Sequence, residues 1–366
     1  MEIGSVLELE EWSLYEIVKQ KKKFWLPFMG DNEKYETIFY QSGRNAIEDL
    51  LAYLKKERNI TKILLPDYMC ETVKAAAIRA GISLEYYKVD SYFSYLPDEI
   101  EEKLSKETCL FVAHYFGKKP DEEVLKSIQK WKKNGTIIIE DVTLSLFSSD
   151  NDGKVGFGTY VLGSIRKWLP IPDGGFLASY TEKLPPQLCS THVSKYTDFY
   201  FMVQAMKREY VKGGCVNKAL KKIYMDYYGL SIRELFSDYK LYPMSEWTTN
   251  YLQNYDICEV IKKRKQNYDY LYEKIESIEG LTCKIKREEG YLPLGMVIET
   301  RNRDQLLQYL IEKGIYCNVH WRLEPSENNP DSNQLTKGCM TIPCDQRYGK
   351  QEMNYIVEAL EEWYKK

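Results

Sequence analysis

The chain has 366 residues, 44% of them hydrophobic, and a formal net charge of −3. This length and apolar content suffice for a large core and predict two domains. The slightly acidic balance argues against nucleic acid or an anionic membrane surface as a partner.

Neither a targeting segment nor a membrane span is expected. The start, Met1-Glu2-Ile3-Gly4, is not a cationic signal sequence, and no apolar run approaches the roughly 18 residues of a span. Nine cysteines are scattered without CxxC spacing. We therefore expect free thiols, no metal site and a cytoplasmic protein.

The first predicted strand–helix unit follows residues 1–34, which we interpret as an N-terminal arm. Tyr35–Tyr40 is predicted as a strand. A helix is predicted after Ser42-Gly43-Arg44, because apolar residues recur at helical spacing at Ile47, Leu50, Leu51 and Leu54. The free N–H groups at such a helix start can bind phosphate. The alternative is that Ser42 only caps the helix.

Strands and helices then alternate. The predicted strands are 62–65, 84–89, 109–114 and 136–141, and the predicted helices are 67–80, 98–104 and 121–132. Repeated units of this length indicate a mostly parallel sheet with helices on both faces.

Asp141 ends the apolar run Thr136–Ile139, which is typical of a buried parallel strand. Open α/β sheets place ligand-binding groups at the carboxyl ends of their strands. Asp141 is therefore the first candidate for a catalytic residue.

Lys167 is the second candidate. It lies between the apolar runs 159–162 and 176–180, on a turn that contains Pro170, Pro172 and Asp173-Gly174-Gly175. Pro fixes φ and disfavours helix before it, so we expect Lys167 on rigid backbone between two buried strands. Because Arg166 is its neighbour in sequence, we expect the amine of Lys167 to lose its proton more easily. A neutral amine can form a Schiff base with an aldehyde.

A strand-end aspartate followed by a turn lysine matches what pyridoxal 5′-phosphate (PLP) requires. The lysine carries the cofactor, and the carboxylate pairs with the pyridine nitrogen and keeps it protonated.

The segments Ile139–Thr143, Ser164–Lys167 and Asp173–Gly175 resemble those of the DegT family of PLP-dependent sugar aminotransferases. The resemblance runs from about residue 35 to the C-terminus. It implies an α/β, three-layer fold of type I, with a mostly parallel sheet in a large domain and a small C-terminal α+β domain. It also implies a homodimer.

The resemblance extends to the cofactor-binding residues. Phosphate binding is expected from Ser42, Gly43 and Ser164, and Arg44 is a further cofactor-binding candidate. Tyr68 is expected to stack on the cofactor ring and His114 to lie above it. For both side chains the alternative is an ordinary core residue, which is the commoner role of a tyrosine and of a lone histidine.

The resemblance also sets the domain limits. Residues 35–245 are expected to form the large domain and 246–366 the small one, with a long helix within 242–278 connecting them. Two departures indicate a divergent member: Leu144 stands where the family has His or Gln, and no Asn precedes Met244-Ser245.

The function implied is transfer of an amino group from an amino acid, with glutamate as the expected donor, to a nucleotide-linked keto-sugar. His320, Arg322 and Arg347 are candidate substrate-binding residues, with Arg166 as a further cation and Trp321 as a stacking ring. Two alternatives stay open: another PLP reaction on the same scaffold, and a non-catalytic PLP-binding regulator or scaffold.

Overall fold

The computed structural model describes residues 1–10, 36–148, 156–188, 192–253, 255–287, 290–324 and 329–365. Residues 11–34 of the predicted N-terminal arm therefore lie outside the described residues.

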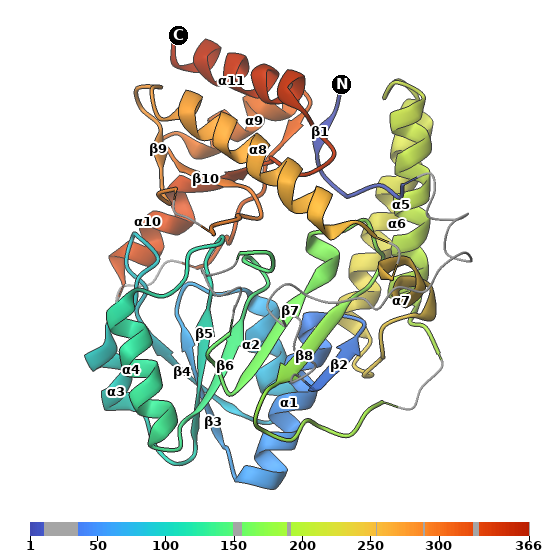
Figure 1. The fold of residues 1–366 in the computed structure, drawn as a ribbon. Helices are drawn as coiled ribbons and strands as arrows, with labels where there is room; N and C mark the ends of the chain where they lie inside the picture. Colours follow the sequence, from blue (N-terminus) through green and yellow to red (C-terminus); the bar gives the residue numbers. More distant parts are fainter. Residues whose placement is uncertain are drawn as a thin grey trace.

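A seven-stranded sheet forms the centre of the larger part of the molecule (Figure 1). Its strand order is β2-β8-β7-β6-β5-β3-β4. Only β8 runs against the others, because it pairs antiparallel with both β7 and β2. The strands are β2 (Glu36–Tyr40), β3 (Lys62–Pro66), β4 (Ser83–Tyr87), β5 (Thr108–Ala113), β6 (Ile137–Asp141), β7 (Tyr160–Ser164) and β8 (Gly175–Ser179).

Four helices connect these strands and cover the sheet. They are α1 (Gly43–Arg58), α2 (Glu71–Arg79), α3 (Pro97–Lys103) and α4 (Glu122–Lys133). α1 packs on α2 and α3 packs on α4. α1 and α2 connect strands in one direction along the sheet, and α3 and α4 connect strands in the other direction. Right-handed crossovers in opposite directions lie on opposite faces, so the two pairs cover the two faces of the sheet (Figure 1).

Local sequence features explain where α1 begins and ends and which of its faces is buried. Ser42 caps it by accepting a hydrogen bond from Asn45 N–H, and its apolar positions at i, i+3, i+4 and i+7 are buried. Asn59 ends it in the left-handed conformation. The helix is the one predicted, and its first turn reaches the carboxyl edge of the sheet.

The segment of the chain between β8 and the C-terminal strands is helical, as expected. It contains α5 (Lys195–Lys212), α6 (Lys218–Ser237), α7 (Glu246–Leu252) and α8 (Ile257–Ile275). The single connecting helix predicted within 242–278 is instead two helices. Ser245 and Asp256 each cap a helix start with their side chains, which divides the segment.

A three-stranded antiparallel sheet, β12-β10-β9, forms the C-terminal part. Its elements are β9 (Thr282–Cys283), β10 (Met296–Glu299), α9 (Arg303–Glu312), β11 (Ile315–Tyr316), α10 (Pro330–Gly338), β12 (Cys339–Ile342) and α11 (Lys350–Tyr364). β1 (Ile3–Gly4) pairs with β11, so the N-terminus joins this part (Figure 1).

The architecture confirms the predicted fold class: a mostly parallel α/β sheet followed by a small C-terminal α+β unit. No helix in the described ranges combines the length and the apolar character that crossing a bilayer requires.

Candidate active site

Three neighbouring strands bring polar side chains to one edge of the sheet. β5 ends at Ala113 opposite Asp141, the last residue of β6, and Asp141 in turn pairs with Leu162 of β7. Parallel strands end at the same edge, so His114, Asp141 and Ser164 lie next to one another. The sequence placed Asp141 here from its position alone.

Lys167 follows directly from the end of β7. The predicted turn begins as one turn of 3-10 helix, Ile165–Lys167, before the chain turns back into β8. A Cβ on Gly175 would lie 2.1 Å from the backbone carbon of Ser42. Only glycine permits this approach, which brings the start of α1 against the lysine-bearing turn.

Asp173 fixes the turn from the other side. Its buried carboxylate accepts hydrogen bonds from Ser245 N–H at 2.9 Å, from Ser245 Oγ at 3.0 Å and from Thr248 Oγ1. Burial raises its pKa to about 6, although these hydrogen bonds oppose the rise. The start of α7 is thereby tied to the segment that carries Lys167.

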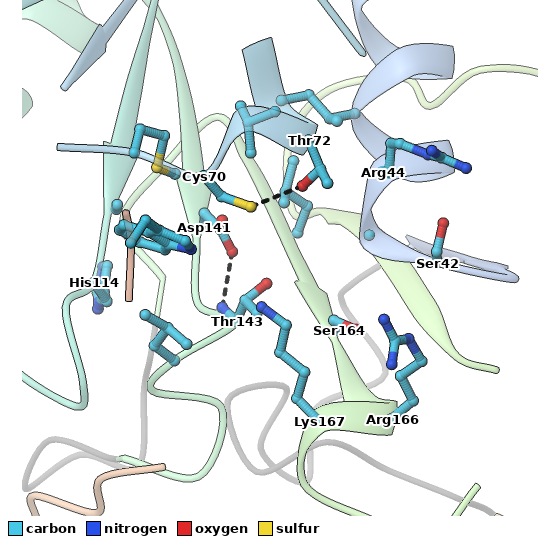
Figure 2. A pocket seen from close by; sticks show the side chains of 18 of the residues that line it. Ser42, Arg44, Cys70, Thr72, His114, Asp141, Thr143, Ser164, Arg166 and Lys167 are labelled. Atoms are coloured by element: carbon cyan, nitrogen blue, oxygen red, sulfur yellow. Dashed lines mark hydrogen bonds between the residues drawn. The ribbon is translucent and has the colours of Figure 1, made fainter. Parts of the chain in front are cut away.

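A cavity lies above this edge, with opposite charges at its two ends. In Figure 2, Ser42, Arg44, Ser164 and Arg166 lie on one side, Asp141 and His114 on the other, and Lys167 between them. Asp141 is the only carboxylate among the described lining residues. The other lining residues are Gly43, Ile47, Met69, Cys70, Thr72, Val73, Ala113, Thr143, Leu144, Leu162, Leu235 and Trp321.

The pKa values of Lys167 and Asp141 are both shifted by this environment. Burial lowers the pKa of the Lys167 amine below its usual value, and the charge of Arg166 acts in the same direction, whereas Cys70 and Asp141 oppose it. Burial raises the pKa of Asp141, although Thr143 N–H donates to its Oδ1 at 2.8 Å. The amine is thus easier to deprotonate, and the carboxylate would gain from a cationic partner.

His114 lines the cavity at the Asp141 end. Its Nε2 lies 2.6 Å from Glu140 Oε1, and its ring stacks on Phe157 with centroids 5.6 Å apart. Glu140 Oε2 accepts two backbone hydrogen bonds at 2.8 Å, from Phe157 and Gly158. Buried neighbours therefore enclose the imidazole, although neither of its ring nitrogens makes a hydrogen bond among the described residues.

Tyr68 does not line the cavity among the described residues. Its ring is buried behind it, with its centroid 5.2 Å from that of Trp321. A helix was predicted from residue 67, but residues 67–70 are not helical and lead into α2, so that Cys70 at its N-cap position lines the cavity instead. Cys70 carried no sequence signal, because a lone cysteine outside any motif is usually an ordinary core thiol. Stacking of Tyr68 on the cofactor stays a prediction that this placement does not favour.

A second cavity also reaches Lys167 and is lined partly by residues of the C-terminal part. His320 lines it with Arg166 and Lys167, and so does Arg347. Arg347 donates to Asp345 through Nε at 2.8 Å and Nη2 at 2.9 Å, and to Glu8 at 2.7 Å. Most of its donors are therefore already committed.

The remaining candidate substrate-binding residues lie in different places. Trp321 lines the first cavity, whereas Arg322 is exposed, pairs with Asp304 at 3.1 Å and lines neither of the two cavities. Burial and the charge of Lys167 lower the pKa of His320 to about 3, so its imidazole is neutral near pH 7.

The residues present fit PLP. A buried carboxylate without a full counter-charge suits the pyridinium nitrogen, and a lysine of lowered pKa suits the aldehyde. At the other end, the Nε atoms of Arg44 and Arg166 are buried and have no hydrogen-bond partner among the described residues. That end suits a phosphate.

The chain matches no protein-family model and no curated protein by sequence. Its structure is similar to that of a putative sugar aminotransferase from Streptococcus pneumoniae in its PLP form, with a TM-score of 0.70, 14% identity, and coverage of 100% of this chain and 99% of the other. The structure is also similar to that of PseC from Helicobacter pylori, an aminotransferase involved in pseudoaminic acid biosynthesis. The TM-score is 0.66 and the sequence identity is 13%, with 100% of both chains covered.

A DegT DnrJ EryC1 StrS aminotransferase from Brucella abortus gives a TM-score of 0.62 and 14% identity, over 98% of this chain and 92% of the other. The chain thus has the fold of these aminotransferases over its whole length, at low sequence identity.

Proposed function

We propose that this protein is a PLP-dependent aminotransferase. The observation that carries the proposal is the placement of Lys167 between Asp141 and a cationic end within one cavity. The fold supports it, because solved structures of the same architecture are described in forms with PLP and with its amino derivative.

The proposal gives each residue a part. Ser42, Gly43, Arg44 and Ser164 would bind the phosphate, and Asp141 would pair with the ring nitrogen. When bound, PLP supplies a conjugated ring that accepts the electrons left when the Cα–H bond breaks. Lys167 Nζ would take the proton from Cα and return it to the cofactor carbon, for which a lowered pKa is favourable.

We further propose glutamate as the amino donor and a nucleotide-linked keto-sugar as the acceptor, in the synthesis of amino sugars or surface glycans. The similarity to sugar aminotransferases supports this choice. The second cavity supports it too, since it reaches Lys167 and contains the polar side chains of His320, Asn318 and Tyr228. Hydroxyl-rich substrates need such groups.

Two half-reactions test the proposal. The protein loaded with PLP is mixed with glutamate, and the change of cofactor absorbance to that of the amino form is followed. Nucleotide keto-sugars and 2-oxoglutarate are then added separately. We expect conversion by glutamate and restoration by at least one keto-sugar, and no conversion in Lys167→Ala.

The outcomes test the sugar acceptor and the aminotransferase activity separately. Restoration by simple keto acids alone would make the protein an amino-acid transaminase and remove the sugar acceptor. Absence of conversion by any amino acid would remove the aminotransferase and favour a PLP-binding regulator.

A further inference from the structure

Two arginines lie at the cavity end that is away from Asp141 (Figure 2). Arg44 is the second residue of α1, and Arg166 lies in the 3-10 helix that also carries Lys167. Both line the same cavity. Burial lowers the pKa of Arg44, and the positive charges of Arg79 and Arg166 lower it further, whereas the negative charge of Glu48 raises it. Two guanidinium groups are thus brought together against their mutual repulsion.

Neither arginine forms an ion pair with an acidic side chain in the described part of the chain, and Glu48 acts on Arg44 only from a longer distance. In the described ranges, no carboxylate lies within ion-pair distance of Arg44 or Arg166. Aromatic rings hold the side chains instead: Arg44 lies over Phe236 at 5.7 Å, and Arg166 over Tyr196 and Tyr200 at 5.5 and 5.4 Å. Ring contacts orient a guanidinium without balancing its charge.

The arginines also keep unused donors. The Nε atom of each is buried and lacks a hydrogen-bond partner in the described part of the chain. A buried donor that stays unpaired is costly, and more so when it is charged. An anion that binds between the two side chains would remove this cost.

The neighbouring groups favour a dianion with several acceptor oxygens. Ser164 lines the same end, and Ser42 Oγ accepts from Asn45 N–H at 3.2 Å, which leaves its hydroxyl hydrogen able to donate. The first turn of α1 contains no acidic residue. The end thus offers hydroxyl donors and two guanidinium groups, with no competing carboxylate.

We propose that Arg166 and Arg44, both from one chain, are the charged ligands of the cofactor's phosphate. The inference rests on the proposed function and assigns Arg166 to the cofactor rather than to a substrate carboxylate. Guanidinium binds phosphate oxygens in pairs, which explains arginine rather than lysine at both positions. The residue before the cofactor lysine and the residue after Ser42-Gly43 therefore act as one anion site.

The test measures binding rather than turnover. PLP and pyridoxal, which lacks the phosphate, are titrated separately into cofactor-free wild type, Arg166→Gln, Arg166→Lys and Arg44→Gln, with protein fluorescence as the readout. Arg79→Gln is the matched control: Arg79 acts electrostatically on Arg44 but pairs with Glu48 at 2.6 Å and does not line the cavity. The melting temperature of each variant is also recorded with and without inorganic phosphate.

We expect Arg166→Gln to weaken PLP binding about 10-fold or more while pyridoxal binding changes less than about twofold. Arg166→Lys should fall between, and Arg79→Gln should match wild type. Inorganic phosphate should raise the melting temperature of wild type but not of Arg166→Gln or Arg44→Gln.

An unchanged ratio of PLP to pyridoxal affinity in Arg166→Gln would overturn the inference while leaving the proposed function intact. An equal loss of affinity in Arg79→Gln would overturn it as well, since the effect would then come from a diffuse field. Wild type that binds no PLP would overturn the proposed function itself. If inorganic phosphate still raised the melting temperature in that case, and only with both arginines present, the anion site would exist even though the proposed function is wrong.

Discussion

At the scale of single residues, burial lowers the pKa of both Lys167 and Lys207, and the two lysines differ in the surroundings of their amines. Burial lowers the pKa of Lys207 to about 8, yet that amine donates to Gly4 C=O at 3.0 Å and faces Glu2 at 3.5 Å. Lys167 instead lines a cavity together with Asp141. A lowered pKa gives reactivity only where an aldehyde can enter.

The first prediction compares these two lysines. After incubation with PLP and borohydride reduction, mass spectrometry of the digested protein should place one pyridoxyl group on the Lys167 peptide. Lys167→Ala should carry none, whereas Lys207→Met should be labelled like wild type. Labelling of another lysine in wild type would refute the assignment.

The second prediction concerns Asp141. Asp141→Asn should still bind PLP, because the phosphate end is untouched, but should lose at least about 100-fold in turnover, since a neutral amide cannot stabilise a protonated ring nitrogen by charge. Stopped-flow absorbance of the glutamate half-reaction measures this loss. Near-normal turnover would remove Asp141 from the mechanism.

The third prediction concerns His320 in the protein without cofactor. Its folded pKa of about 3 lies below the unfolded value of about 6.5. Between these values the unfolded chain binds a proton that the folded chain does not, so stability falls as pH falls below about 6.5. Above that pH, His320 contributes no pH dependence.

Urea unfolding of wild type and His320→Gln at several pH values isolates this contribution. The stability of wild type minus that of the variant should be constant above about pH 7 and decrease towards pH 4.5, by at most about 1.4 kcal/mol per pH unit. Parallel curves over the whole range would show that His320 titrates normally in the folded protein.

At the scale of elements, the first ten residues connect parts of the chain that are distant in sequence. β1 pairs with β11, Lys221 pairs with Glu2 at 2.8 Å, and Gln204 donates to Leu7 C=O at 2.9 Å. Arg347 adds the contact to Glu8 from the C-terminal part. The segment thus holds α5 and α6 against β11 and forms one wall of the second cavity.

The fourth prediction removes residues 2–8. The deletion takes Glu2 away from Lys207 and Glu8 away from Arg347, so the melting temperature should fall by roughly 5 °C or more. None of these residues lines the cofactor cavity, so PLP affinity should change less than about threefold. Differential scanning calorimetry and PLP titration check the two statements. A large loss of PLP affinity with little loss of stability would contradict the structural role.

At the scale of the whole molecule, the α5–α6 hairpin stands beside the large sheet (Figure 1) and exposes large apolar side chains. Met202, Ile223, Met225 and Phe236 are between 42% and 50% exposed. Exposed large apolar side chains on one hairpin are consistent with an association surface. We therefore retain the homodimer as a proposal, together with the domain limits 35–245 and 246–366.

The fifth prediction follows from these exposed side chains. Light scattering should give twice the chain mass of 43.1 kDa. Ile223→Lys should shift the protein towards the monomer, whereas the matched change Ile311→Lys, at an exposed apolar residue of α9, should not. A monomer in wild type with full activity at the same concentration would exclude the dimer.

The sequence by itself determined the features that depend on short-range rules. A buried apolar run ending in Asp141, a proline- and glycine-rich turn after Lys167, and a capped amphipathic helix after Ser42 each predicted a local structure. Because parallel strands end at one edge, these local structures also implied a common site. The fold class followed from the alternation of strands and helices.

The tertiary structure decided what depends on contacts between distant residues. It committed Arg347 to Asp345 and Glu8, buried Tyr68 behind the cavity and brought Cys70 into its wall. It also placed Arg166 and Arg44 at one end of the same cavity, 122 positions apart in sequence. Periodicity describes which face of an element is buried, but it carries no information on which side chain of another element lies opposite.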